Sequence, residues 1–191
     1  PQGVQGWVAQ EYVKFYLPEG LPYYAGKFNS TPFTSSLEAS ILQYMKEIYS
    51  SNRLKRNDKL SIVVQDLTNG EILVSLRSRQ SVKSASTIKL PILHAYMIQR
   101  FKGKIKASSN HKKLIEEMIR FSSNSSTNTI IKLLGGTKNI QRLLNNTKLY
   151  KELNLLETIP EDGRTYRNKI SAADLNQLFV NIWFKRVIGV K

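Results

Sequence analysis

The feature that most constrains the fold of this chain is a β-hairpin pattern near residue 70. Two runs rich in β-branched residues, 60–67 and 71–77, flank the pair Asn69-Gly70. An Asn-Gly pair between two such runs is a strong hairpin signal. Because two strands alone rarely form a stable sheet, we expect further strands beyond Lys191. This chain would then hold only the first hairpin of an antiparallel sheet.

Helical patterns lie on both sides of the hairpin. Upstream, apolar side chains recur at helical spacing over 35–51, with Thr34 or Ser35 as the candidate N-cap. Downstream, the spacing predicts helices at 84–101, 110–121, 125–134, 137–152 and 171–185. A helix, a hairpin and then a block of helices predict an α+β fold with a helical subdomain and an antiparallel sheet.

The first 33 residues have a different character and predict a separate segment. Residues 1–16 contain a short strand pattern, and 17–33 are a linker that begins with closely spaced Pro and Gly. The phrase from Gly6 to Val13 resembles the closing strand of bacterial Src-homology-3-type wall-binding modules; an ordinary amphipathic strand is the alternative. We expect the main domain to occupy 34–191 and to be truncated at its C-terminus.

Composition excludes several kinds of chemistry. The formal net charge is +15, which points to an anionic partner. No aromatic-interleaved basic motif or zinc-finger spacing accompanies that charge, so we do not expect nucleic acid as the partner. The chain has no cysteine and only two histidines, so thiol chemistry and a histidine metal cluster are excluded, and we expect neither a metal nor a cofactor. Its apolar runs are too short to span a membrane.

A Ser-x-x-Lys pattern at Ser86 to Lys89 is the first candidate for catalysis. Residues three apart on a helix share one face, so the amine can reach the hydroxyl. A lysine acts as a base only when desolvation or nearby cations lower its pKa, and apolar residues follow Ser86 while no acid occurs between Glu71 and Glu116. A second Ser-x-x-Lys, starting at Ser109, lies among polar residues that would keep its lysine hydrated.

Two further features refine this candidate. Pro91 would disrupt the interior of a helix, so the helix should begin late, near Ser84 or Ala85, with Ser86 at its N-terminus. There, unpaired backbone amides can stabilise an oxyanion.

A polar turn at 121–128 lies between two apolar helical stretches. Such a turn is usually only a place where helices are capped. Within it, however, Ser122 and Asn124 supply a hydroxyl that could relay a proton and an amide that could hold a substrate. Asn128, four residues further on, could pin the loop.

Three phrases in this order resemble successive blocks of the class A β-lactamase-like serine hydrolases, which are relatives of penicillin-binding proteins. They run from Ser84 to Leu93, from Met118 to Asn128 with the following Gly135-Gly136, and from Asn168 to Leu175. The resemblance covers roughly 34–186.

The resemblance implies a role for each matched residue. Ser86 would be the acylated nucleophile, Lys89 its activating base, Ser122 the proton shuttle to the leaving nitrogen and Asn124 a ligand of the substrate amide. Asn128 belongs to the same block and is grouped with Asn124 as a binding residue. The oxyanion hole would use the backbone amide of Ser86 and one from a later strand.

Three departures from the family pattern limit this transfer. The family's Ser-Asp-Asn is here Ser122-Ser123-Asn124, which lacks a bracing carboxylate, and no Lys-Thr-Gly or Lys-Ser-Gly occurs. The deacylating glutamate could be Glu152, Glu157 or Glu161, or have no equivalent. A carboxylate that holds a water would give a β-lactamase, and its loss would leave a persistent acyl-enzyme, as in penicillin-binding proteins.

We therefore expect a serine hydrolase or acyl-transferase that acts on β-lactams or D-Ala-D-Ala-type cell-wall peptides. A non-catalytic penicillin-binding-like scaffold or wall-binding protein is the alternative. A periplasmic, secreted or cell-envelope location follows from the resemblance. An anionic cell-wall polymer is a second candidate partner, because basic residues cluster at Arg100, Lys102, Lys104, Lys106, Lys112 and Lys113.

Overall fold

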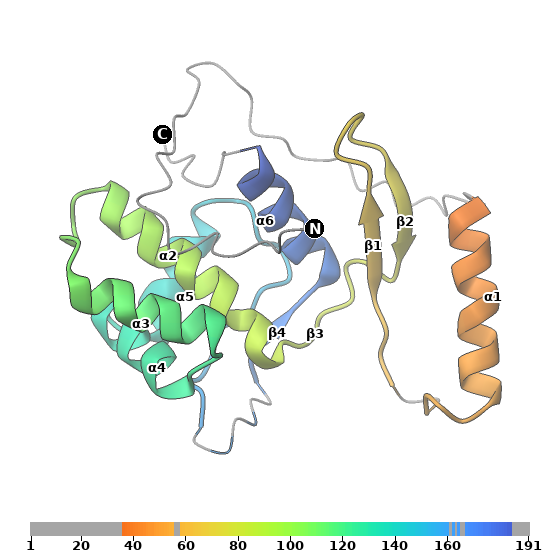
Figure 1. Cartoon of the computed structure of the whole chain (residues 1–191), viewed down its shortest axis with the longest axis horizontal. Helices are drawn as coiled ribbons and strands as arrows, with labels where there is room; N and C mark the ends of the chain where they lie inside the picture. The colour runs from red at the N-terminus through yellow and green to blue at the C-terminus, as the bar shows by residue number, and fades with distance from the viewer. Residues whose placement is uncertain (1–35, 56–57, 161, 163, 165–166, 185–191) are drawn as a thin grey trace, which may run out of the picture.

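The computed structural model describes residues 36–55, 58–160, 162, 164 and 167–184 (Figure 1). The predictions for the segments 1–16 and 17–33 lie outside these residues. Within them the fold is α+β, as expected, with the helices α2 to α6 on one side of the molecule and α1 with a hairpin on the other. None of the described helices is both long and apolar enough to cross a bilayer.

The predicted hairpin is confirmed, with strands β1 (Ile62–Gln65) and β2 (Ile72–Leu76) pairing antiparallel. The connection is longer than a two-residue turn. The Asp66 carboxylate accepts the backbone N–H of Thr68 at 2.7 Å, and Gly70 has a φ of 79°, a conformation that glycine adopts without strain. The turn therefore begins at Asp66, before the Asn-Gly pair.

Helix α1 (Ser36–Ser50) packs beside β2. The buried carboxylate of Glu38 accepts the backbone N–H of Ser75 at 3.0 Å. This contact joins the helix to a strand of the hairpin and uses a backbone donor that a two-stranded sheet would leave unpaired.

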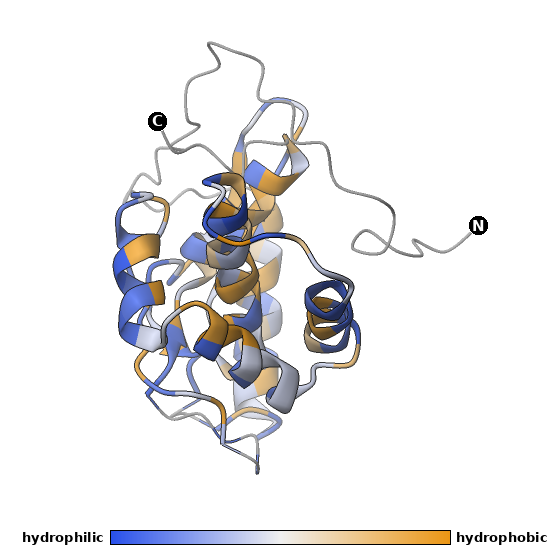
Figure 2. Ribbon diagram, turned by 90° about the vertical axis from the view of Figure 1, so that its left-hand side faces the viewer, coloured by the Kyte–Doolittle hydropathy of each residue, from blue (hydrophilic) through white to orange (hydrophobic). Residues whose placement is uncertain are grey.

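The core lies among the helices and is built around α2 (Lys89–Phe101). A 3-10 turn, η1 (Ala85–Ile88), leads into α2, so the helical segment begins at the predicted place. Pro91 lies in the first turn of α2, where its missing N–H has no intrahelical partner to lose. Figure 2 shows apolar residues gathered where the helices meet and hydrophilic residues on their outer surfaces.

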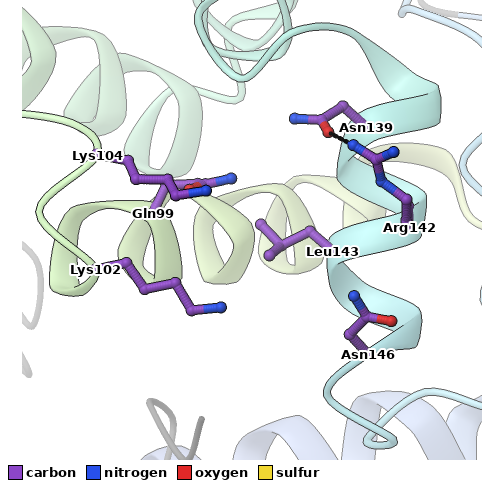
Figure 3. Close-up of a pocket in the computed structure, with 7 residues that line it drawn as sticks. All are labelled: Gln99, Lys102, Lys104, Asn139, Arg142, Leu143 and Asn146. Carbon is purple, nitrogen blue, oxygen red and sulfur yellow. Dashed lines mark hydrogen bonds between the residues drawn. The ribbon is translucent and has the colours of Figure 1, made fainter.

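Three further helices surround α2. They are α3 (Ser109–Arg120), α4 (Asn124–Leu133) and α5 (Thr137–Asn145). Fully buried Met118, Ile130, Ile140 and Leu144 join Ile88, Ile92 and Ile98 in one cluster. The C-terminal end of α2 faces α5 across a polar hollow (Figure 3).

The predicted helix over 137–152 is too long, because α5 ends at Asn145. Lys148 has a left-handed φ of 56°, and the chain then continues as an irregular segment. Leu149, Tyr150 and Leu153 are buried in it, so their apolar spacing reflects anchoring to the core and not a helix. The buried carboxylate of Asp174 accepts the backbone N–H groups of Lys151 and Glu152, both at 2.9 Å, and so satisfies donors that a helix would have paired internally.

A second antiparallel pair, not predicted from the sequence, places the segment before Ser86 against a later part of the chain. Strand β3 (Val82–Lys83) pairs with β4 (Lys169–Ile170), and α6 (Ala172–Trp183) follows with Ser171 as its N-cap. The backbone N–H of Ser84 also donates to the carbonyl of Asn168 at 3.0 Å. These contacts hold the chain segment just before the turn that carries Ser86.

Candidate active site

Ser86 and Lys89 come together at the junction of η1 and α2. Ser86 is exposed, whereas Lys89 is only 3% exposed. The Lys89 Nζ lies 3.3 Å from the Ser86 Oγ. Ala85, just before Ser86, has a left-handed φ of 44°, which is uncommon for a residue with a β-carbon. The predicted pairing of amine and hydroxyl is therefore present in the fold.

The loop between α3 and α4 supplies the other half of the cluster. The Lys89 Nζ lies 2.7 Å from the Ser122 Oγ and 2.9 Å from the Asn124 Oδ1, and it also contacts the Ser122 carbonyl oxygen. The Ser122 hydroxyl donates to the Ser86 Oγ at 3.0 Å. Ser122 itself has a left-handed φ of 53°, which is part of the loop geometry at the cluster. We call these four residues, Ser86, Lys89, Ser122 and Asn124, the Ser86 cluster.

The surroundings of Lys89 favour a neutral amine. Burial removes the ammonium from water and lowers the pKa of Lys89 below its usual 10.5. No carboxylate forms an ion pair with Lys89 among the described residues. The carbonyl of Ser122 and the side-chain oxygen of Asn124 can only accept hydrogen bonds. A neutral amine donates to both and keeps its lone pair for a hydroxyl proton.

Ser123 holds the loop by capping α4. Its hydroxyl oxygen accepts the backbone N–H of Ser126 at 3.1 Å and donates to the Ser126 Oγ at 3.0 Å. The Ser126 hydroxyl in turn donates to the Glu117 carboxylate on α3. Ser123 occupies the place of the family's Asp, so a cap and a carboxylate from another helix brace this loop. A serine directly before the first residue of a helix is the signal that could have predicted the cap.

Asn128 lies on α4 and uses its amide to hold a different segment. Its Nδ2 donates to the carbonyl of Ile159 at 2.7 Å, and its Oδ1 accepts the N–H of Ile159 at 2.9 Å. Asn128 thus pins the segment around Ile159 to α4, whereas the sequence suggested that it would pin the 121–128 loop. Its printed hydrogen bonds do not reach the Ser86 cluster.

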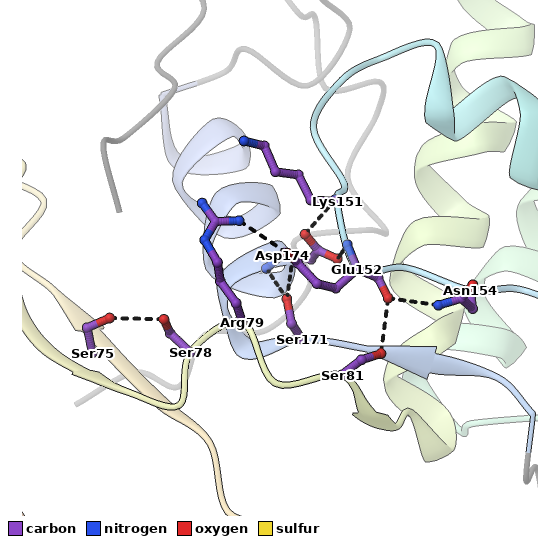
Figure 4. A network of polar contacts seen from close by, with 9 residues as sticks. All are labelled: Ser75, Ser78, Arg79, Ser81, Lys151, Glu152, Asn154, Ser171 and Asp174. Atoms are coloured by element: carbon purple, nitrogen blue, oxygen red, sulfur yellow. Dashed lines mark hydrogen bonds and ion pairs between the residues drawn. The ribbon is translucent and has the colours of Figure 1, made fainter. Parts of the chain in front are cut away.

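The structure does not bring the described candidate glutamates to the Ser86 cluster. Glu152 forms an ion pair with Arg79 at 3.2 Å and accepts the Ser171 hydroxyl at 3.2 Å (Figure 4). The Glu157 carboxylate accepts the backbone N–H of Arg167 at 3.0 Å. Glu161 lies outside the described residues. Within the described ranges, no group of three His, Cys, Asp or Glu side chains could hold a metal ion.

Comparison with known proteins gives the family and the fold of this chain. A family model described as the Beta-lactamase enzyme family matches residues 42–111 and 107–191. The chain belongs to this family. No curated protein matches it.

Solved structures share the fold. A variant of the last common ancestor of Gram-negative class A β-lactamases superposes with a TM-score of 0.61 at 16% identity, over 80% of this chain and 64% of that one. An ancestral class A β-lactamase gives 0.59 at 17% identity, over 80% and 66%. A β-lactamase from Chitinophaga pinensis gives 0.64 at 16% identity, over 78% and 65%. This chain therefore spans less than two thirds of the length of these structures.

Proposed function

We propose that this protein forms a serine ester at Ser86 with β-lactams or with D-Ala-D-Ala-type cell-wall peptides. The observation that carries the proposal is the position of one buried amine, Lys89 Nζ, within 3.3 Å of two hydroxyl oxygens on different elements. Because D-Ala-D-Ala-type peptides belong to the bacterial cell wall, we also propose a location in the cell envelope.

The contacts that join Lys89, Ser86 and Ser122 suggest how acylation would proceed. The Lys89 amine takes the proton of Ser86, and the Ser86 Oγ bonds to the substrate carbonyl carbon. When the tetrahedral intermediate collapses, the C–N bond breaks. The Ser122 hydroxyl, 3.0 Å from the Ser86 Oγ, gives its proton to the leaving nitrogen and recovers one from Lys89 at 2.7 Å. Lys89 ends neutral again, so the protons balance.

Asn124 and the start of η1 would hold the substrate during this step. The Asn124 Oδ1 accepts from Lys89, which leaves its Nδ2 to donate to a substrate amide carbonyl. The backbone N–H of Ser86 lies at the beginning of a helical turn, where it has no intrahelical acceptor and can donate to the developing oxyanion.

We further propose that the acyl-enzyme is long-lived. Hydrolysis of a serine ester needs a base that activates a water. Glu152 pairs with Arg79, and Glu157 accepts a backbone N–H of its own loop. In the segment that carries these glutamates, the residue that Asn128 holds against α4 is Ile159. Its buried side chain is apolar and cannot act as a base. In the part of the chain that the structure describes, none of these residues offers a free base, and we expect acylation to outpace release.

A fluorescent penicillin tests the nucleophile. The protein should become covalently labelled, and Ser86→Ala should abolish the label. Ser109→Ala, in the second Ser-x-x-Lys pattern, is the matched control and should label like the wild type. Equal labelling of Ser86→Ala would remove Ser86 from the mechanism. No labelling of the folded wild type would favour a non-catalytic scaffold.

Turnover of nitrocefin tests the lifetime of the ester. We expect a stoichiometric burst followed by slow release, with no change in the release rate in Glu152→Gln or Glu161→Gln. Rapid turnover that either substitution abolishes would show that this glutamate serves as the deacylating base.

A further inference from the structure

A polar hollow of about 180 Å³ lies between the C-terminal end of α2 and helix α5. Figure 3 shows Lys102 and Lys104, which follow the end of α2, reaching into it. Opposite them lie Arg142 on α5 and Asn146, just after that helix. The hollow is separate from the Ser86 cluster. Gln99, which also lines the hollow, lies 13 positions after Ser86, and at the helical rise this puts the two sites roughly 20 Å apart.

The hollow has a strong and uncompensated positive charge. None of Lys102, Lys104 and Arg142 takes part in an ion pair within the described residues. The two stretches of chain that build it, 72–115 and 118–151, contain no Asp or Glu at all. The C-termini of α2 and α5 each contribute about half a negative charge, so three full cations leave the hollow positive.

Part of this surface is held in place before any ligand arrives. The Arg142 guanidinium donates to the Asn139 Oδ1 at 2.7 Å, and the Asn139 Nδ2 donates to the carbonyl of Leu134 at 2.6 Å. These two bonds orient the guanidinium and leave its other N–H donors available. A donor group fixed in this way loses less conformational entropy when it binds an anion.

Gln99 adds an unsatisfied acceptor to the same hollow. Its Oε1 is buried and has no hydrogen-bond partner in the part of the chain that the structure describes. A buried acceptor without a donor is costly, so turning the Gln99 amide toward a ligand hydroxyl in the hollow would be favourable.

We propose that this hollow binds a phosphate group. Near neutral pH a phosphate monoester or free phosphate carries more than one negative charge, several acceptor oxygens and a fraction of P–O–H, because its second pKa is close to 6. It can thus accept from two lysines and one arginine and still donate to Gln99. A carboxylate has one charge, two oxygens and no proton to donate at that pH.

Calorimetric titration of the full chain tests this proposal. At constant ionic strength, tripolyphosphate should bind, and the variant Lys104→Gln/Arg142→Gln should bind it at least about 10-fold more weakly, because two charge-assisted contacts are lost. The control Lys112→Gln/Lys132→Gln removes the same charge from exposed positions outside the hollow and should change the Kd less than about 2-fold.

Further probes identify the source of the phosphate and can overturn the proposal. Tighter binding of tripolyphosphate than of inorganic phosphate indicates a chain of phosphates, and equal binding indicates a single group. Equal weakening in both double variants, citrate binding as tight as tripolyphosphate binding, or no binding to the wild type would each contradict a phosphate site. Because the readout is not acylation, this result is independent of the proposed function.

Discussion

At the scale of single residues, the chemistry depends on how Lys89 is solvated. An exposed lysine is an ammonium near neutral pH and cannot take a proton. Lys89 is buried, has no carboxylate partner among the described residues, and faces two oxygens that only accept. Burial and the lack of a carboxylate partner disfavour the ammonium form, and a neutral amine can donate to both oxygens. The site is therefore suited to activating Ser86.

Replacing Lys89 with arginine should remove the base while retaining a long cationic side chain. A guanidinium stays protonated in proteins, so we expect Lys89→Arg to slow penicillin labelling by about 10²–10⁴-fold. Lys112→Arg, in the second Ser-x-x-Lys pattern, is the matched control and should label at the wild-type rate. Labelling of Lys89→Arg at an unchanged rate would contradict the role of Lys89.

The rate of labelling should also depend on pH with a definite sign. Burial lowers the pKa of Lys89, and only the unprotonated amine can accept the Ser86 proton. The second-order labelling rate of the wild type should therefore fall as the pH drops through that lowered pKa. A rate that stays constant or rises on acidification would be inconsistent with this mechanism.

At the scale of secondary-structure elements, the cap of α4 positions Ser122 and Asn124. Removing a serine N-cap costs about 1 kcal/mol. We expect Ser123→Ala to lower the free energy of unfolding in urea by about that amount and to slow labelling, because both flanking residues belong to the Ser86 cluster. Ser125→Ala, at an exposed position in the first turn, should change the unfolding free energy by less than about 0.5 kcal/mol. Equal effects of the two substitutions would contradict the importance of the cap.

The elements that the sequence predicted well are those with a local signal. The Asn-Gly pair between the two hairpin strands and the proline near the start of α2 are signals that act within a few residues. The predicted end of α5 was wrong, and the contact that holds Lys151 and Glu152 in a non-helical segment comes from Asp174, more than 20 residues away. Strands β3 and β4 have two residues each, which is too short for any periodicity to be visible.

Only part of the candidate site has a local signal, so only that part could be predicted from the sequence. The Ser86–Lys89 pair is a local helical relation, whereas the approach of Ser122 depends on how α3 and α4 pack against α2. Family resemblance supplied that pairing before the structure showed the distances. The partners of Glu152, Arg79 and Ser171, come from two distant segments that no local pattern connects.

At the scale of the whole molecule, a buried acidic network joins the segment after α5 to α6 and to the chain between β2 and β3. Asp174 caps the backbone of Lys151 and Glu152, and Glu152 contacts Arg79 and Ser171 (Figure 4). Burial raises the pKa of Asp174 to about 6, with a further contribution from the negative charge of Glu152, while the two backbone N–H bonds act in the opposite direction.

This shift predicts how stability changes with pH. Between the unfolded value of 3.8 and about 6, the native state binds more protons at Asp174 than the unfolded chain. The contribution of this group to the unfolding free energy should therefore decrease as the pH rises through that window, by about 1–3 kcal/mol in total. Urea unfolding of the wild type and of Asp174→Asn at pH 4 and pH 7.5 isolates the effect. A difference between the two proteins that does not vary with pH would contradict it.

Activation of Ser86 requires that the folded molecule keep the amine of Lys89 easy to deprotonate, and nuclear magnetic resonance can measure this property in solution. The side-chain signals of ¹⁵N,¹³C-labelled lysines can be followed against pH, with Lys89 assigned by the signal that Lys89→Arg loses. We expect a titration midpoint below the ordinary 10.5 in the native protein, and an ordinary midpoint after unfolding in urea. A native midpoint at or above 10.5 would contradict it.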